Sequence, residues 1–196
     1  MTEKDDKPRK VIIIGEGGCG KTCMIIRLID NNFVEDGIAT IGVSFKKKTF
    51  IVSKNKQVDI NFWDTCGQEE FKSVVKTYMR GSDCVIVAFD VSNRNTFDEM
   101  NCWIRQAREI LTESVPIVIA ASKIDLPRMI DWEDVESFCE SLDCTFFKVS
   151  SKTGEGINEL FQYVAELAYQ HGVSMEENGN NVNIVDDNNE NQKKCC

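Results

Sequence analysis

The segment GEGGCGKT, residues 15–22, is the feature that most constrains how this chain folds. It follows an apolar run, KVIIIG (10–15), and precedes residues 20–31, where apolar side chains recur at helical spacing. Glycines let backbone amides curl around phosphate oxygens, and the start of a helix adds the positive end of its dipole. In this strand–loop–helix setting, the pattern G-x-x-x-x-G-K-T predicts a site for a nucleoside triphosphate.

The residues of this loop have distinct expected roles. Lys21 would reach the outer phosphates, and the hydroxyl of Thr22 would be a ligand of Mg²⁺. The other residues that we expect to contact the nucleotide here are Gly17, Gly18, Cys19, Gly20 and Cys23. The alternative, a glycine-rich turn that binds nothing, is disfavoured by the flanking strand and helix.

Strand-like and helix-like segments alternate along the chain. Expected strands lie at 10–15, 83–90, 115–120 and 144–150, and expected helices at 20–31, 68–80, 94–112, 131–142 and 155–170. Residues 40–63 differ, because two strands follow each other around residues 53–56 and predict a hairpin. We therefore expect an α/β fold with a six-stranded, mostly parallel sheet, one antiparallel edge strand and helices on both faces.

Composition limits the classes of function. A net charge of −9 without a basic stripe argues against binding to nucleic acid. Nine cysteines without a C-x-x-C pair, beside one histidine, predict reduced thiols rather than disulfides or a zinc site. Neither a secretory signal nor a run of ~20 apolar residues is present, so we expect a cytosolic chain. We expect a flexible N-terminus (1–9), one folded domain (10–171) and a disordered, asparagine-rich tail (172–196).

Two further segments are expected to act on the phosphates. In NFWDTCGQEE (61–70), Asp64 ends a strand and could hold Mg²⁺ through water. The amide of Gly67 could meet a γ-phosphate, and Gln68 could orient an attacking water. Thr40 precedes the edge strand, where its hydroxyl could complete the metal shell. With Lys21, the expected catalytic residues are therefore Gln68 and Gly67.

The segment SKID (122–125) ends another apolar strand and predicts recognition of guanine. The ionised carboxylate of Asp125 only accepts hydrogen bonds, and guanine offers N1–H and an exocyclic amine side by side. Adenine presents an acceptor at that ring nitrogen and would be rejected. Lys123 would lay its aliphatic stem along the base. Backbone amides of Ser150, Ser151 and Lys152 could bind a base carbonyl such as guanine O6.

In order and spacing, these motifs resemble those of the Rab family of small GTPases in the Ras superfamily. The likeness rests on GEGGCGKT, Thr40, WDTCGQE, SKID and SSK, and its Rab character on IGVSF (41–45), FKSVVKTYMRG (71–81) and the last two cysteines. The resemblance implies a Ras-like P-loop fold that binds GTP or GDP with Mg²⁺. It implies slow hydrolysis of GTP to GDP and phosphate unless a GTPase-activating protein assists.

The resemblance also implies roles for several aromatic residues and for the tail. Phe33 would pack across the guanine, and the effector surface would be an aromatic triad of Phe45, Trp63 and Tyr78. Cys195 and Cys196 would both be geranylgeranylated, because two lipids anchor a protein stably where one does so only marginally.

The implied biology is that of a monomeric switch domain in vesicle trafficking. It would recruit effectors and respond to an exchange factor and an activating protein. A prenylation escort and a GDP-dissociation inhibitor would handle its lipids. The expected location is the cytoplasmic face of an intracellular membrane, in exchange with the cytosol.

Departures from the family pattern leave alternatives open. Ser122 stands where the family has asparagine, whose side chain bonds guanine N7 and braces the phosphate loop; serine is too short for both. A fast-exchanging, weakly hydrolysing scaffold is therefore the alternative function. A kinase or ATPase would need a different base contact than Asp125 with Lys123. Cys23, near a helix start, suggests a thiol of lowered pKa and a redox switch, against the plainer interpretation of a packing residue.

Overall fold

The computed structural model describes residues 3–34, 42–53, 56–65 and 72–181. Its strands are β1 (Glu3–Lys4), β2 (Arg9–Ile14), β3 (Val43–Ser53), β4 (Lys56–Thr65), β5 (Cys84–Asp90), β6 (Ile117–Ser122) and β7 (Thr145–Lys148). They form one sheet in the order β1-β4-β2-β5-β6-β7, with β3 also paired to β4. The β3–β4 pair is antiparallel and every other pair in the described sheet is parallel. The predicted α/β fold and its hairpin are confirmed.

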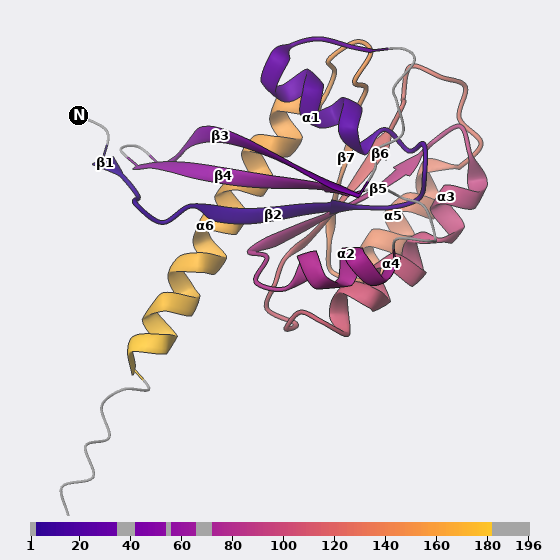
Figure 1. The fold of residues 1–196 in the computed structure, drawn as a ribbon. Helices are drawn as coiled ribbons and strands as arrows, with labels where there is room; N and C mark the ends of the chain where they lie inside the picture. Colours follow the sequence, from indigo (N-terminus) through magenta and orange to yellow (C-terminus); the bar gives the residue numbers. More distant parts are fainter. Residues whose placement is uncertain (1–2, 35–41, 54–55, 66–71, 182–196) are drawn as a thin grey trace, which may run out of the picture.

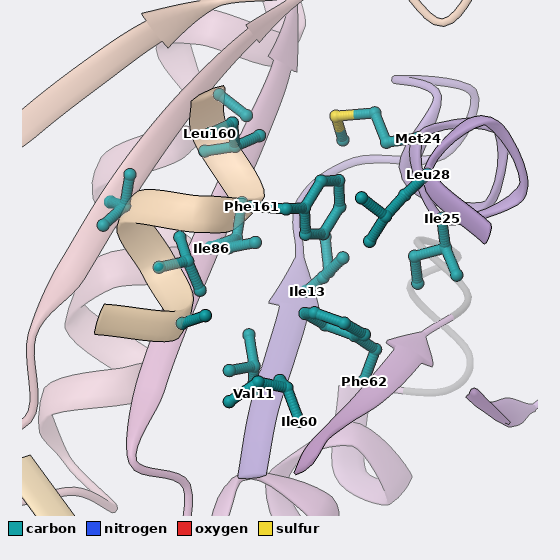
Figure 2. Packing of buried hydrophobic residues seen from close by; sticks show 14 of the residues in the cluster. Val11, Ile13, Met24, Ile25, Leu28, Ile60, Phe62, Ile86, Leu160 and Phe161 are labelled. Atoms are coloured by element: carbon teal, nitrogen blue, oxygen red, sulfur yellow. The ribbon is translucent and has the colours of Figure 1, made fainter. Parts of the chain in front are cut away.

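Helices cover both faces of this sheet (Figure 1). They are α1 (Lys21–Asp30), α2 (Lys72–Met79), α3 (Arg94–Asp98), α4 (Met100–Arg108), α5 (Trp132–Ser141) and α6 (Ile157–Asn181). Along β2, Val11 and Ile13 belong to the core packed by α1 and α6, whereas Ile12 and Ile14 belong to the core packed by α2 to α5. In Figure 2, the ring of Phe161 from α6 lies between Ile13 and the apolar face of α1. Because successive side chains of a strand point to opposite faces of the sheet, β2 contributes to both cores.

One expected helix and the expected number of strands differ from what is observed. The helix expected at 94–112 is two helices, α3 and α4, which meet at Glu99. The six-stranded sheet gains a seventh strand, because β1 pairs with Lys56 and Gln57 at the start of β4. Glu3, Lys4 and Arg9, which belong to the N-terminal segment expected to be flexible, thus take part in the sheet.

Helix α6 continues past the expected domain boundary at residue 171, and ion pairs with the N-terminal segment explain this. Arg9 is 2% exposed and its guanidinium bonds Glu176 on α6 at 2.6 Å and Asp5 at 3.1 Å. Gly172 leaves the necessary space, because a Cβ there would lie 2.3 Å from a guanidinium nitrogen of Arg9. None of the helices that the structure describes combines the length and the apolar character of a membrane span.

Candidate functional site

The carboxyl ends of β2, β4, β5, β6 and β7, with the described loops that follow them, gather at one edge of the sheet. Parallel strands end at the same edge, so residues far apart in sequence meet there. The register pairs Ile13 with Asp64 and Asp90 with Ser122. Every described segment that the sequence assigned to the nucleotide lies in or beside these loops.

Glycines shape the loop between β2 and α1. Gly15 has φ of +136°, and a Cβ on it would lie 2.2 Å from the carbonyl oxygen of Ala88 on β5. Any side chain at this position would therefore push β2 and β5 apart. Gly20 precedes α1 with φ of +89°, a left-handed conformation that favours glycine. Gly17 and Gly18 are exposed, so the outer side of the loop is open.

Lys21 lies under this loop and closes it. Its side chain is almost fully buried, and Nζ donates to the carbonyl oxygens of Gly15 and Glu16, each at 2.7 Å. Glu16 is in turn fixed by α4, because the indole nitrogen of Trp103 donates to its carboxylate at 2.9 Å. Lys21 thus places a positive charge at the centre of a loop that α4 holds in position.

Ser122 braces the same loop from β6. Its hydroxyl lies 2.6 Å from the carbonyl oxygen of Cys19 and 2.7 Å from that of Phe89. A hydroxyl has a single hydrogen, so Ser122 donates to one of these carbonyls at a time. The residue is 2% exposed. Asparagine performs two tasks at this position in the family. In this structure Ser122 performs one of them, because it braces the loop.

The two charged residues of SKID are held by different partners. Asp125 is exposed, and one of its carboxylate oxygens accepts from the buried Ser150 hydroxyl at 2.5 Å. Lys123 has φ of +61° and its ammonium lies 2.6 Å from the carboxylate of Asp90. The Cε of Lys123 lies about 4.0 Å from the Cβ position of Gly20, so its stem passes beside the phosphate loop. The structure therefore brings SKID, Ser150 and the loop together.

Asp90 was not predicted as a site residue. It is 6% exposed at the end of β5, and its carboxylate accepts from Lys123 and from the amide and hydroxyl of Ser92. A pattern in the sequence could have identified Asp90, because it is an aspartate at the end of a buried strand. The same pattern identified Asp64 as a candidate.

Arg27 on α1 was not predicted either, although it fixes the loop after β7. Its Nε donates to the Ser151 carbonyl at 2.6 Å and Nη2 to the Lys152 carbonyl at 2.8 Å. Nη1 donates to the carbonyl of Asn31 at the end of α1, at 3.0 Å. A single guanidinium therefore ties the segment expected to face the base to the helix expected to follow the phosphates.

Two of the three donors expected to hold Mg²⁺, Thr22 and Asp64, lie in the described residues, and both carry oxygen atoms. Asp64 is 1% exposed at the end of β4, and the hydroxyl of Ser44 lies 3.4 Å from its carboxylate. The register places Asp64 beside Ile13 near the end of β2, the strand that leads into the loop before α1. Carboxylate and hydroxyl oxygens are hard ligands of the kind that Mg²⁺ prefers. The described residues contain no cluster of three or more histidine, cysteine or acidic side chains arranged for another metal site.

The expectation of a lowered pKa for Cys23 is wrong. Burial raises the pKa of this thiol, and the carboxylate of Asp64 raises it further against the opposing charge of Lys123. The start of a helix favours a thiolate, but the low polarity around a half-buried sulfur outweighs that effect here. The plainer interpretation, a small packing residue on α1, agrees with these surroundings.

The three aromatic residues of the expected effector surface form one contiguous group. The rings of Phe45 and Trp63 are 5.6 Å apart, and those of Trp63 and Tyr78 are 5.3 Å apart. Phe45 is 50% exposed, so the group faces solvent at the β3 side. Phe33 is half-buried beyond the end of α1. The expected residues Thr40, Gly67, Gln68, Cys195 and Cys196 lie outside the described residues.

Comparison with known proteins identifies the family. The model of the Ras family matches residues 10–170. Ras-related protein Rab-1A of Dictyostelium discoideum is 32% identical over 158 residues, which cover 80% of this chain and 78% of that protein. GTP-binding protein ypt5 of Schizosaccharomyces pombe is 30% identical over 161 residues, covering 81% and 76%. Ras-related protein SEC4 of Saccharomyces cerevisiae is 29% identical over 199 residues, covering 97% and 92%. The chain therefore belongs to the Ras family, as a small GTPase of the Rab type.

Proposed function

We propose that this chain is a GTP-binding switch of vesicle trafficking that hydrolyses GTP to GDP and phosphate. The observation that carries the proposal is the meeting of two sites at one sheet edge. One is the glycine loop closed by Lys21, and the other is Asp125 anchored by Ser150. The first suits the phosphates of a nucleotide and the second suits the donor edge of guanine.

The proposed mechanism assigns a task to each group. Lys21 and the loop amides hold the outer phosphates. Thr22, Thr40 and Asp64 would hold Mg²⁺, which would neutralise negative charge on these phosphates. Gln68 orients water for in-line attack on the γ-phosphate, and the Gly67 amide binds that phosphate. GEGGCGKT and WDTCGQEE contain no arginine to stabilise the transition state, so a partner protein supplies that charge.

The proposed partners follow from the exposed aromatic group and from the tail. Effectors would bind the surface of Phe45, Trp63 and Tyr78, whose rings lie in contact. An exchange factor would release GDP, and a GDP-dissociation inhibitor and a prenylation escort would bind the lipidated tail. Two lipids on Cys195 and Cys196 would anchor the chain to the cytoplasmic face of an intracellular membrane.

The first test is to identify the nucleotide in the freshly purified chain and to time its release with Mg²⁺ present. The proposal predicts bound GDP and slow conversion of added GTP to GDP and phosphate. Bound adenine nucleotide, or no binding of guanine nucleotide at all, would contradict it.

A second candidate function is favoured by Ser122. Because its single hydroxyl proton is engaged by backbone carbonyls, guanine N7 receives no donor from this residue. The chain would then be a fast-exchanging, weakly hydrolysing scaffold, and its state would depend on nucleotide occupancy rather than on hydrolysis. Single-turnover hydrolysis with an activating protein separates the two functions, because the activating protein would accelerate GTP hydrolysis only if the chain is a switch.

Replacing Ser122 with asparagine should slow the release of GDP. The amide offers two hydrogens, one for the Cys19 carbonyl and one for guanine N7, where serine offers one. One more hydrogen bond at a buried site is worth about 1–3 kcal/mol, or roughly ten- to hundredfold in release rate. Stopped-flow fluorescence with a fluorescent GDP analogue measures the release rate. Ser122→Ala, which removes the brace, should release faster than wild type, and an unchanged rate in Ser122→Asn would refute the argument.

Replacing Arg27 with lysine should speed GDP release by roughly three- to tenfold. Lysine retains the charge but cannot donate to the Ser151 and Lys152 carbonyls in parallel, so one bond of about 0.5–1.5 kcal/mol is lost. Arg108→Lys is the matched control, because Arg108 also donates to backbone carbonyls, around Val115, away from the site. Equal release from both variants would show that Arg27 does not support the base loop.

A further inference from the structure

Two cysteines that the proposed function does not use meet at the turn between α5 and β7. Cys139 is on the last turn of α5 and is 3% exposed, and Cys144 precedes β7 and is half-buried. Both are free thiols, and both line the same surface pocket at this turn. The sequence predicted only isolated reduced cysteines, because C-x-x-x-x-C is not a familiar redox or metal spacing.

The turn itself brings the two sulfurs together. The amide of Cys144 donates to the carbonyl of Cys139 at 3.0 Å, and the amide of Asp143 donates to that of Glu140 at 3.2 Å. Asp143 has φ of +49° after Leu142, the last residue of the helix cap. These are the two bonds and the left-handed residue of a Schellman motif, in which the third-last helical residue contacts the second residue past the cap. Here both of those positions are cysteines.

The backbone bond also bounds the separation available to a disulfide. With standard bond lengths on either side of the 3.0 Å bond, the two Cα atoms lie no more than about 7 Å apart. Natural disulfides join Cα atoms up to about that distance. A bridge therefore needs a rotation of side chains rather than a movement of α5 or β7.

We propose that Cys139 and Cys144 form a peroxide-sensitive dithiol that closes to a disulfide. Cys144 is the nucleophile, because its half-buried sulfur is open to a small oxidant whereas Cys139 is 3% exposed. The neighbouring Cys139 also lowers the pKa of the Cys144 thiol, against the burial that opposes it. Its thiolate attacks a hydroperoxide: an S–O bond forms, the O–O bond breaks, and an alcohol or water leaves. Cys139 then attacks the sulfenic sulfur, an S–S bond forms, and hydroxide leaves with the Cys139 proton as water. Two thiols lose two electrons and the hydroperoxide gains them.

The surroundings favour a small neutral oxidant. The two cysteines line a surface pocket of about 380 Å³ together with Glu136, Glu140 and Asp143. Three carboxylates oppose the approach of an anionic thiol or disulfide such as glutathione, and do not hinder hydrogen peroxide. In the described part of the chain these groups do not form a metal cluster. The proposal does not depend on nucleotide binding.

The test treats the full chain with hydrogen peroxide, blocks remaining thiols in denaturant and cuts after glutamate without reduction. Cleavage at Glu140 separates the two cysteines, so the peptides of Cys139 and Cys144 stay joined only through a disulfide. We expect this link to exceed any pairing among the other described cysteines by about tenfold or more, because the turn already holds the two residues side by side. Recovery of both cysteines as blocked thiols, while other cysteines oxidise, would overturn the proposal.

Single variants separate the attacking thiol from the resolving one. Cys139→Ser should leave Cys144 carrying one or more oxygens, whereas Cys144→Ser should leave Cys139 unoxidised. Cys102→Ser is the matched control, since Cys102 is half-buried on α4 and accepts from Gln106 at 3.2 Å; its disulfide yield should equal that of wild type. Oxidation of Cys139 in Cys144→Ser at the wild-type rate would reverse the assigned roles and reject the mechanism.

Discussion

Replacing Lys21 with methionine should lower the affinity for GDP and GTP by about 30- to 5000-fold. Methionine retains the apolar stem but removes the only charge at the centre of the phosphate loop, and losing one partner of a buried charge pair costs about 2–5 kcal/mol. The Nζ of Lys21 also donates to the Gly15 and Glu16 carbonyls, so the variant loses two bonds that hold the loop closed. Titration calorimetry with GDP measures the affinity directly.

A control separates loss of binding from loss of folding. Lys48 on β3 also donates to a backbone carbonyl, that of Leu28 at 2.6 Å, but lies away from the loop. Lys48→Met should change the affinity for GDP by no more than about twofold, as substitutions away from a site usually do. Thermal unfolding of both variants without nucleotide reports the contribution of each bond to stability. Wild-type affinity in Lys21→Met would remove this loop from the proposed site.

Sequence patterns predicted those parts of the fold that depend on local physics. Apolar runs such as VIII in β2 are continuous because the strand is buried on both faces, and that burial is visible in the letters. The extent of α6 was not predictable in this way. Gly172 suggested an end, whereas its small size admits Arg9, whose partner Glu176 is 167 residues away along the chain. A contact between residues so far apart along the chain leaves no periodic pattern in the sequence from which it could be predicted.

The same division applies to the candidate site. Lys21, Ser122 and Asp125 were predicted because each belongs to a short motif whose spacing has a chemical reason. Arg27 and Asp90 belong to no motif, and their importance arises only when α1, β5 and the base loops are placed beside one another. The hypothesis of a lowered pKa at Cys23, raised beside the plainer interpretation of a packing residue, is contradicted for a related reason, since burial, which the sequence did not reveal, outweighs the helix start.

Replacing Asp125 with asparagine should change the preferred base from guanine to xanthine. In the proposed site the carboxylate would accept from both N1–H and the exocyclic amine of guanine, whereas asparagine presents one acceptor and one donor group. The Asn oxygen can still accept from Ser150 and from N1–H, so its NH₂ faces the exocyclic amine as donor against donor. Losing a hydrogen bond to a charged group and leaving a donor unpaired lowers GDP affinity by roughly 30- to 1000-fold.

Xanthine supplies the complementary pattern, because it carries a carbonyl where guanine has the amine. Xanthosine diphosphate should therefore bind the variant more tightly than GDP does and bind wild type poorly, in competition assays with a fluorescent nucleotide. Asp131→Asn makes the same chemical change at the exposed residue before α5 and should leave base preference as in wild type. Weak binding of both nucleotides would mean that the loop anchored by Ser150 has collapsed. Unchanged GDP affinity would mean that the Asp125 carboxylate does not contact the base, and the assignment to guanine would then fall.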